Sequence, residues 1–380
     1  MKILIVSHEF PPIGGGGANA CFFLGKEYVK NGHEVTILTS SFRKLPRFET
    51  VEGVEIIRVK AFRKQETTST LVEMFSYLVS AFIKANRLAK KRKYDICHVF
   101  FGIPSGPVGF WLKKRYAIPY VVRLGGGDIP GAQKRYAFVY KVIGMPLRKI
   151  WKEADAVVAN SEGLLQRARR FSEAGKFRII SNAVDAALFI RNPDTDKKRD
   201  EVHILFVARL IEAKGIQNII PMMQTLNDKA GKKIYLDIVG DGPYKSTLKH
   251  IVQRCGVEQF VMFHGQKNKT ELLEFYNMAD LFIFPATSEG MPNVVLEAMA
   301  MGLPIIMTPC EGSKELVTDN GIITCIESFQ DAVLELMCDE EKRKSMGINS
   351  RSNIVKYFTW DVAAEKYMTL FTEIIQAARG

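Results

Sequence analysis

Short runs rich in valine and isoleucine alternate with longer, helix-like segments, and this rhythm occurs twice along the chain. Runs such as KILIVS and DAVVANS are almost continuously apolar, without the polar alternation of a strand that faces water on one side. Such strands are typical of parallel sheets that helices cover on both faces. The strands expected in the first half are 2–7, 34–40, 54–59, 95–101, 119–124, 155–161 and 177–181.

The second half repeats the pattern, with strands expected at 202–208, 234–240, 260–265, 280–285, 304–308 and 321–326. A chain of 380 residues exceeds what one hydrophobic core normally serves. Residues 190–201 are polar and aperiodic, which is typical of a linker. We therefore expect an α/β protein with two doubly wound, Rossmann-like domains, residues 1–190 and 200–358. The amphipathic segment 360–380 is expected to form one helix that packs back on the first domain.

The composition is that of a soluble globular protein, with 47% hydrophobic and 25% charged residues. The six cysteines form no C-x-x-C pair, which argues against structural zinc or a disulfide framework and suits a reducing cytosol. The start MKILIVS is too short for a signal peptide, and no run reaches the roughly 18 apolar residues of a membrane span. We expect a cytoplasmic protein.

The positive charge is concentrated in the first half of the chain. Residues 1–195 contain 32 Lys and Arg against 16 Asp and Glu, whereas the remainder contains 21 and 25. This asymmetry indicates an anionic partner for the first domain: a membrane surface, a phosphorylated acceptor or nucleic acid. Solvated helix faces and helix C-termini, where cations are favourable, are the alternative explanation.

Four strand-to-helix loops have the composition of ligand-binding loops. HEFPPIGGGGANA contains Gly14–Gly17 before a helix expected to begin near Ala18, so its backbone can approach an anion closely. It lacks the third glycine of a dinucleotide fingerprint and the G-K-[ST] of a P-loop. Taken alone this loop is weak evidence, because a flexible turn without function is the alternative interpretation.

The loop VARLIEAKG follows the first strand of the second domain and contains Arg209 and Lys214. Two cations at the carboxyl end of a strand can bind a diphosphate, although a surface pair would look the same. The third loop, IVGDGP, has small residues that permit close packing. The fourth, ATSEGMPNVVLEAMAMGLP, contains Glu289 before a helix start at Pro292, and Glu297 within an apolar run. A buried carboxylate needs hydrogen-bond partners, from the protein or from ribose hydroxyls.

Taken in order, these segments resemble glycosyltransferase family 4, which has the GT-B fold, over essentially the whole chain. SEGMPNVVLEAMAMGLP resembles the E-x7-E region of the family, VARLIEAKG its G-R-L-x-x-x-K-G stretch and IVGDGPYKSTL its V-G-x-G-P turn. HEFPPIGGGG resembles its N-terminal glycine-rich loop, and ADAVVANSE and IISNAVDAALF resemble two further motifs of the family, which lie between strands. The fold implied is two Rossmann-like domains, an acceptor domain followed by a donor domain.

The resemblance implies a role for each matching residue. Arg209 and Lys214 would neutralise the donor diphosphate, Glu289 would contact the donor sugar and Glu297 would bind the ribose. The remaining residues expected at the nucleotide-sugar are Gly15, Gly16, Gly265, Gly290, Met291, Pro292 and Asn293. The implied reaction is transfer from a nucleotide-sugar, most commonly a UDP-sugar, to an acceptor hydroxyl with retention of anomeric configuration, without a required metal or other cofactor.

One departure from the family concerns the acceptor side. The family commonly has H-G-x-D where this chain has Gly125 to Asp128, so a glycine stands at the histidine position. We expect Asp128 to position the acceptor and the glycines to leave space. Ala183 and Ala208 replace usual glycines, which we expect to be tolerated.

Residues 71–94 predict an amphipathic helix with a basic end. It either packs its apolar face into the core or lies on anionic lipid. We expect a glycan or lipid-linked acceptor in polysaccharide or glycoconjugate synthesis, with peripheral contact to the inner face of the plasma membrane. Two alternatives remain: a hydrolysing nucleotide-sugar epimerase of the same fold, and a nucleic-acid-binding protein, for which no recognised motif is present.

Overall fold

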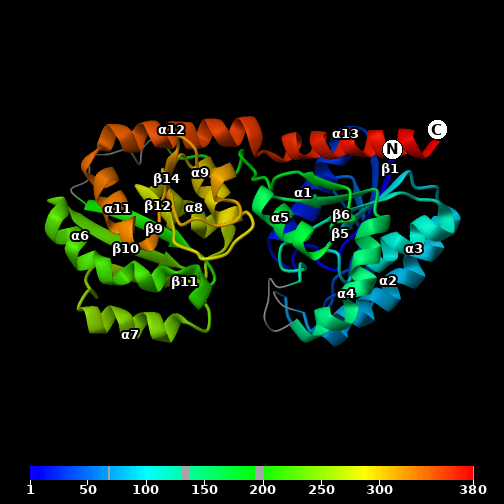
Figure 1. Cartoon of the computed structure of the whole chain (residues 1–380), viewed down its shortest axis with the longest axis horizontal. Helices are drawn as coiled ribbons and strands as arrows, with labels where there is room; N and C mark the ends of the chain where they lie inside the picture. The colour runs from blue at the N-terminus through cyan, green and yellow to red at the C-terminus, as the bar shows by residue number, and fades with distance from the viewer. Residues whose placement is uncertain (67–68, 131–136, 193–200, 380) are drawn as a thin grey trace. The chain divides into compact units, whose positions relative to one another are not determined.

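The computed structural model describes residues 1–66, 69–130, 137–192 and 201–379 (Figure 1). The chain forms two compact units, Met1–Asn182 with Trp360–Gly380, and Ala183–Thr359. The division falls before the predicted linker, most of which (193–200) lies outside the described residues. Val184 and Phe189 explain the earlier boundary, because both are buried in the core of the second unit.

The first unit contains an eight-stranded sheet in the order β3-β4-β2-β1-β5-β6-β7-β8. All neighbouring strands are parallel except β3 and β4. The strands are β1 (Lys2–Val6), β2 (Glu34–Ser40), β3 (Phe48–Val51), β4 (Val54–Val59), β5 (Ile96–Phe100), β6 (Tyr120–Arg123), β7 (Ala156–Ala159) and β8 (Phe177–Ile179). The sequence did not predict β3, an edge strand joined to β4 by a tight turn in which Glu52 and Gly53 both have positive φ.

Helices cover both faces of this sheet. The helices are α1 (Gly16–Lys30), α2 (Leu71–Lys91), α3 (Gly106–Tyr116), α4 (Ala137–Glu153), α5 (Glu162–Phe171) and α13 (Trp360–Arg379). In Figure 1, α1 and α13 lie on one side of the sheet and α2, α3 and α4 on the other. The C-terminal helix α13 belongs to this unit because it packs on α1, where Trp360 stacks on Phe23 with ring centroids 5.3 Å apart.

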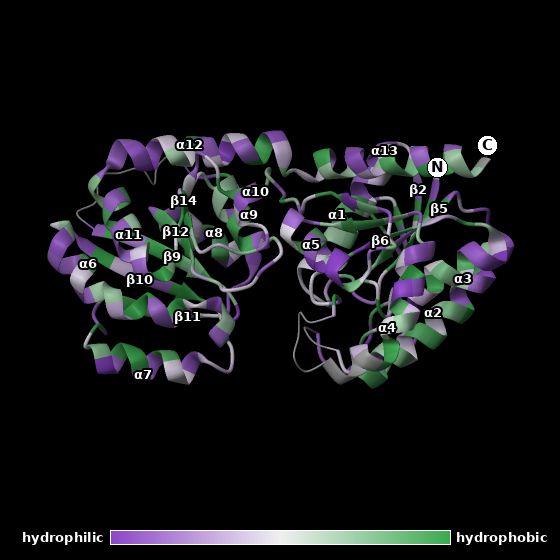
Figure 2. Cartoon of the chain, in the orientation of Figure 1, coloured by the Kyte–Doolittle hydropathy of each residue, from purple (hydrophilic) through white to green (hydrophobic). Residues whose placement is uncertain are grey.

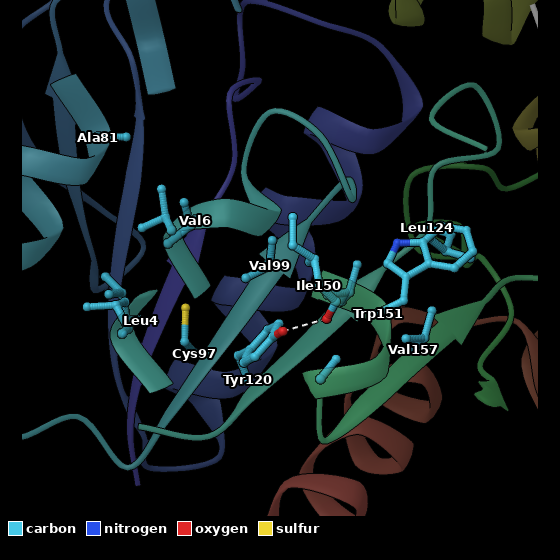
Figure 3. Close-up of a cluster of buried hydrophobic side chains, with 14 of the residues drawn as sticks. Leu4, Val6, Ala81, Cys97, Val99, Tyr120, Leu124, Ile150, Trp151 and Val157 are labelled. Atoms are coloured by element: carbon cyan, nitrogen blue, oxygen red, sulfur yellow. Dashed lines mark hydrogen bonds between the residues drawn. The ribbon is translucent and has the colours of Figure 1, made fainter. Parts of the chain in front are cut away.

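The core on the α2–α4 side contains Leu4, Val99, Tyr120 and Trp151, all fully buried (Figure 3). The Tyr120 hydroxyl donates a hydrogen bond to the carbonyl of Ile150 in the last turn of α4 (2.5 Å). Continuous apolar strands therefore face helices on both sides, as their composition predicted.

The second unit contains a six-stranded, entirely parallel sheet in the order β11-β10-β9-β12-β13-β14. Its strands are β9 (Glu201–Val207), β10 (Lys233–Val239), β11 (Val261–Gly265), β12 (Leu281–Phe284), β13 (Ile305–Met307) and β14 (Gly321–Ile323). The chain order runs outward from β9 to one edge and then returns to continue from β12 to the other edge. The carboxyl ends of β9 and β12 are therefore the topological switch point, where doubly wound sheets bind ligands.

Two cores sandwich this sheet, one beneath α8, α9 and α12 and the other beneath α6, α7 and α11. The α-helices are α6 (Met223–Ala230), α7 (Lys245–Cys255), α8 (Lys269–Met278), α9 (Asn293–Ala300), α10 (Ser313–Leu316), α11 (Phe329–Cys338) and α12 (Glu340–Tyr357). Short 3-10 helices occupy Glu212–Lys214, Ile216–Asn218, Ile220–Met222 and Ile326–Ser328. Within the described ranges, no helix has both the length and the apolar character to cross a membrane.

Candidate functional site

The loops that follow β9 and β12 carry the most specific predicted residues, and they meet at the switch point of the second sheet. Arg209 lies exposed two residues after β9, and Lys214 ends the short 3-10 helix in the same loop. Glu289 lies in the loop between β12 and α9. The fold therefore places both predicted cations and the predicted sugar-contacting carboxylate on the same edge of the sheet.

Backbone contacts hold these loops against each other. Gly215 has φ +76°, and a Cβ built there would lie 1.9 Å from the Pro285 carbonyl oxygen. The Thr287 N–H donates to the Ala213 carbonyl (3.1 Å), which ties the same two loops together again. Glycine is required at 215 because both the backbone conformation and the close approach exclude a side chain.

Glycines also allow the neighbouring loops to approach each other closely. A Cβ on Gly240 would lie 1.9 Å from the Ala208 carbonyl oxygen, and one on Gly312 would lie 1.9 Å from the Gly290 carbonyl oxygen. The loops after β9, β10, β12 and β13 thus form one connected edge. The small residues of IVGDGP serve this packing, as the sequence predicted.

Lys214 and Glu289 form an ion pair. The side chain of Lys214 is largely buried, and its Nζ lies 5.5 Å from the centroid of the Phe284 ring. Burial lowers the pKa of Lys214 to about 8, and the nearby Cys310 opposes that shift. Lys214 and Glu289, which the sequence predicted to bind adjacent parts of one donor, are therefore in direct contact.

Glu311, in the loop after β13, was not predicted from the sequence. Its Oε2 accepts a hydrogen bond from the Glu289 N–H (2.9 Å), and its Oε1 accepts one from the Ser288 hydroxyl (3.4 Å). Glu311 thus fixes the backbone that carries Glu289. The signal available in the sequence was its position in the loop that follows the predicted strand 304–308, at the edge where the other loops meet.

The predicted helix start after Glu289 is observed, with Pro292 as the N-cap residue of α9 and Asn293 as its first residue. Pro292 itself makes no side-chain capping hydrogen bond. The first N–H groups of a helix lack intrahelical acceptors and carry the positive end of the helix dipole. Gly290 and Met291 lead into this turn, so the segment has the geometry of an anion-binding helix start.

Glu297 lies one turn into α9, among the buried residues Leu296 and Ala298. The hydroxyl group of Tyr276 in α8 donates a hydrogen bond to its Oε2 (3.0 Å). Burial raises the pKa of Glu297 to about 7, and the hydrogen bond from Tyr276 opposes this. Tyr276 was not predicted as a site residue, because its position within an amphipathic helix is typical of a core tyrosine.

Gly265 ends β11 with φ +69°, and its carbonyl accepts a hydrogen bond from the Gly240 N–H (2.8 Å). Next to it, His264 Nε2 lies 2.6 Å from Asp237 Oδ1, and His203 Nδ1 lies 2.7 Å from Asp237 Oδ2. Burial tends to raise the pKa of Asp237, but these two histidine hydrogen bonds outweigh it and the pKa is lowered. Gly265 is therefore anchored to the switch-point loops and lies beside a polar cluster that the sequence did not indicate.

The remaining predicted residues lie at the carboxyl edge of the first sheet. Gly15 is the N-cap residue of α1 and Gly16 its first residue, so the helix begins two residues before the expected Ala18. Gly15, which has no side chain, makes no capping hydrogen bond. Its position after β1, at the switch point between β1 and β5, agrees with an anion-binding role.

Asp128 is buried and joins two loops of the first unit. Its Oδ2 accepts a hydrogen bond from the Gly102 N–H (2.7 Å) and its Oδ1 accepts one from the Gly125 N–H (2.8 Å). Burial raises the pKa of Asp128, and these backbone hydrogen bonds oppose that shift. The carboxylate thus holds the loops after β5 and β6 together. Replacing Asp128 would therefore disturb these loops as well as any acceptor that binds beside them.

Phe101 explains why a glycine stands at position 125. Its backbone has φ +70°, unusual for a bulky residue, and a Cβ on Gly125 would lie 2.5 Å from its ring. A Cβ on Gly17 would lie 2.4 Å from the same ring, whose centroid is 4.8 Å from that of His8. The space expected beside Gly125 is therefore filled by an aromatic side chain, and the expectation of an open space was wrong.

The arrangement at the second unit can bind a compact anion next to a polyhydroxyl group. Two cations and a helix N-terminus supply positive potential, and two carboxylates supply acceptors for hydroxyl groups. Among the described residues, no group of three or more His, Cys, Asp and Glu side chains is arranged to hold a metal ion.

Two family models match the chain. The model described as Glycosyltransferase Family 4 matches residues 14–188, and the model described as Glycosyl transferases group 1 matches residues 191–353. Together they span both units. Each match includes the loops described above for its unit.

Individual proteins show the same similarity. The N-acetyl-alpha-D-glucosaminyl L-malate synthase of Bacillus anthracis is 25% identical, over 99% of this chain and 98% of that protein. The sucrose-phosphate synthase structure from Thermosynechococcus elongatus superposes with a TM-score of 0.85 at 22% identity, covering 99% of this chain and 100% of that one. The structure of Anabaena HepE in complex with UDP and glucose gives 0.74 at 18%, covering 98% and 99%. Both structures confirm the GT-B fold.

Proposed function

Because the chain belongs to glycosyltransferase family 4, we propose that it transfers a sugar from a nucleotide-sugar donor to a hydroxyl group of a glycan or lipid-linked acceptor, with retention of anomeric configuration. The observation that carries the proposal is the convergence of Lys214 and Glu289 at the switch point of the second sheet, next to the N-terminus of α9.

In this proposal the bond between the anomeric carbon and the diphosphate oxygen breaks, and the acceptor oxygen forms the new bond on the same face of the sugar. Negative charge grows on the leaving diphosphate, and stabilising that charge is the largest catalytic contribution available. Arg209, Lys214 and the N–H groups at the start of α9 supply this stabilisation. The acceptor's proton passes to the leaving phosphate, so the reaction needs no separate base.

The carboxylates bind the two ends of the donor. Glu289 accepts hydrogen bonds from hydroxyl groups of the transferred sugar, and Glu297 accepts them from the ribose. Gly265 lies at the neighbouring strand end and contributes close backbone approach to the nucleoside. Gly15 and Gly16, at the start of α1, are the proposed anion-binding backbone groups of the first unit.

A UDP-sugar is the proposed donor. HepE, which shares this fold, is described in complex with UDP and glucose, and uridine is the commonest base in the family. The proposed acceptor is an intermediate of polysaccharide or glycoconjugate synthesis, and the proposed location of the enzyme is the cytoplasm. No metal or other cofactor is part of the proposed reaction.

The first test is a thermal-shift screen of the purified chain with UDP, GDP and ADP, with and without their sugars. A ligand that binds only the native state raises its melting temperature. We expect UDP to give the largest shift and Lys214→Ala to abolish it. Lys342→Ala is the matched control, since it removes a lysine that pairs with Glu335 on the surface of the same unit. No shift with any nucleotide would contradict the proposal.

The second test identifies the reaction. Proton NMR of the products, after incubation with the bound nucleotide-sugar and candidate acceptors, should show the anomeric configuration of the donor. Release of the nucleoside diphosphate with an isomerised free sugar, in the absence of acceptor, would instead identify a hydrolysing epimerase.

A further inference from the structure

Helix α2 has one apolar face that is buried and a second apolar face that is exposed. The face against the sheet carries Tyr77, Ala81, Ala85 and Leu88, all buried. The outward face carries Val72, Phe75, Val79 and Ile83, which are 69%, 67%, 44% and 49% exposed. The helix therefore packs one apolar face into the core, as one of the two expectations had it, and presents a second apolar stripe outward.

The single acidic residue of α2 is absent from this outward stripe. Glu73 is buried, and its carboxylate completes a capping box by accepting a hydrogen bond from the Thr70 N–H (2.7 Å). It also accepts one from the Lys64 N–H (2.9 Å). The capping box fixes where the helix begins and therefore which residues face outward.

Two aromatic residues from neighbouring segments widen the apolar stripe. Phe62 is 74% exposed, and its N–H donates to the Ser76 hydroxyl of α2 (3.0 Å). Phe48 of β3 is also exposed, and Lys84 Nζ lies 4.7 Å from the centroid of its ring. We call the set Phe48, Phe62, Val72, Phe75, Val79 and Ile83 the α2 patch. In Figure 2, green segments run along α2, which lies at the surface of the first unit.

Basic residues continue the same helix beyond the apolar turns. Arg87, Lys90 and Lys91 are exposed in the last two turns, and Lys84 lies at the border of the α2 patch. A helix with exposed apolar turns and a basic end matches a bilayer interface, where apolar side chains enter the acyl boundary and cations meet anionic headgroups.

The charge distribution argues against the other occupants. A second copy docking on the same surface by two-fold symmetry would bring an identical basic set and no acidic residue from α2 to pair with it. An apolar patch of this kind on a soluble protein normally marks an interaction site. The concentration of 32 basic against 16 acidic residues in positions 1–195 favours an anionic occupant.

We propose that the α2 patch and the basic end of α2 form a membrane-binding surface, which inserts Phe62, Phe75 and Val79 into the interface of an anionic lipid bilayer. This surface goes beyond the proposed function, because it would place the first unit on a membrane whatever the sugar and the acceptor are.

The experiment is flotation of the full chain with vesicles of phosphatidylcholine alone and of phosphatidylcholine with 30% phosphatidylglycerol, at physiological salt. We expect retention on anionic vesicles at least five-fold above that on neutral ones. Phe75→Ser/Val79→Ser should reduce retention at least five-fold. Its matched control is Ile348→Ser/Val355→Ser, which removes two exposed apolar residues of α12 in the second unit and should bind as wild type.

A charge variant tests the second half of the surface. Arg87→Glu/Lys90→Glu should lose the preference for anionic vesicles, while Arg169→Glu/Arg170→Glu, with the same net charge change in α5 of the same unit, should keep most of it. Equal loss in both would mean that net charge alone attracts the protein and would overturn the proposal. Failure of the wild type to float would also overturn it.

Two further measurements complete the test. A nucleotide-induced thermal shift in each variant shows that the second unit is intact, so a lost membrane contact is distinguished from a failed donor site. Sedimentation velocity without lipid identifies self-association; a dimer that Phe75→Ser/Val79→Ser dissociates would assign the patch to a second copy and overturn the lipid proposal.

Discussion

The Tyr276 hydroxyl in α8 donates a 3.0 Å hydrogen bond to Glu297 Oε2 in α9 and so fixes a carboxylate among buried apolar residues. The hydrogen bond only partly offsets burial, since the pKa of Glu297 remains raised to about 7. The ionised carboxylate therefore reduces the stability of the second unit. A residue that costs stability at neutral pH is expected to have another role, and the role proposed for Glu297 is to bind the ribose of the donor.

Glu297→Gln should separate that stability cost from the binding role. The folded-state pKa, about 7, lies above the ordinary value of 4.5, so the wild type loses stability as pH rises between those values. Glutamine cannot ionise, so the variant should be the more stable protein at pH 8, by up to about 3 kcal/mol, with little difference near pH 4.5. Melting temperatures across this range check the result, and UDP affinity should fall about ten-fold. Parallel pH profiles would contradict the prediction.

Lys214→Arg should change the pH dependence of nucleotide binding. With a pKa of about 8, Lys214 loses its charge as pH rises through that value, and affinity for a diphosphate should decrease there. Arginine remains protonated, so its affinity should stay level from pH 7 to 9.5 even if it is weaker at pH 7. Calorimetric titration with UDP checks this. An identical decline in both proteins would show that another group controls it.

Glu311→Ala should slow transfer more than it weakens nucleotide binding. Glu311 accepts the Glu289 N–H and so positions a residue proposed to contact the sugar rather than the diphosphate. We expect kcat to fall at least ten-fold while the UDP dissociation constant changes less than three-fold. Glu327→Ala, at an exposed glutamate of the same unit, is the control. A loss of UDP affinity equal to the loss of kcat would contradict a positioning role.

Asp128→Asn should disturb the first unit and leave the donor site intact. An amide would place its NH2 group against the N–H of Gly102 or Gly125, where the carboxylate now accepts from both. We expect a loss of about 1–3 kcal/mol in the unfolding free energy. Transfer should slow, while the UDP-induced thermal shift stays as in wild type. A full transfer rate would remove Asp128 from any role in positioning the acceptor.

Gly215→Ala compared with Gly231→Ala should isolate the loop contact at the donor site. Both glycines have positive φ, +76° and +65°, so each alanine carries a similar backbone cost of about 1 kcal/mol. Only the alanine at 215 would also meet the Pro285 carbonyl oxygen; at 231 the described residues leave nothing within 4 Å. UDP binding should be lost in the first variant and kept in the second. Equal UDP affinity in both would show that the contact is not needed.

The sequence predicted the two parallel sheets because their strands are buried on both faces and are therefore continuously apolar. It missed β3, since Phe48–Val51 is a short edge strand with partly exposed residues. It placed the domain boundary too late because Val184 and Phe189 lie in a segment without a regular period yet are buried in the second core.

The orientation of α2 could not be predicted, because its sequence has two apolar faces with the same period. The exposed face contains Phe75 and Val79, and the buried face contains Tyr77, Ala81, Ala85 and Leu88. Hydrophobicity alone does not choose between them, because both faces contain large apolar residues, and the surface of the sheet decides which face fits. Glu311 and Tyr276 were missed for a related reason: their roles arise from contacts between distant segments, to Glu289 and Glu297.

Gly215, Gly240 and Gly312 allow the switch-point loops to touch main chain to main chain. Loops in such close main-chain contact cannot accept insertions or rearrange much when a donor binds. Selectivity among sugars must then reside in the few side chains that project from these loops. Attempts to change the donor should replace those side chains and keep the glycines.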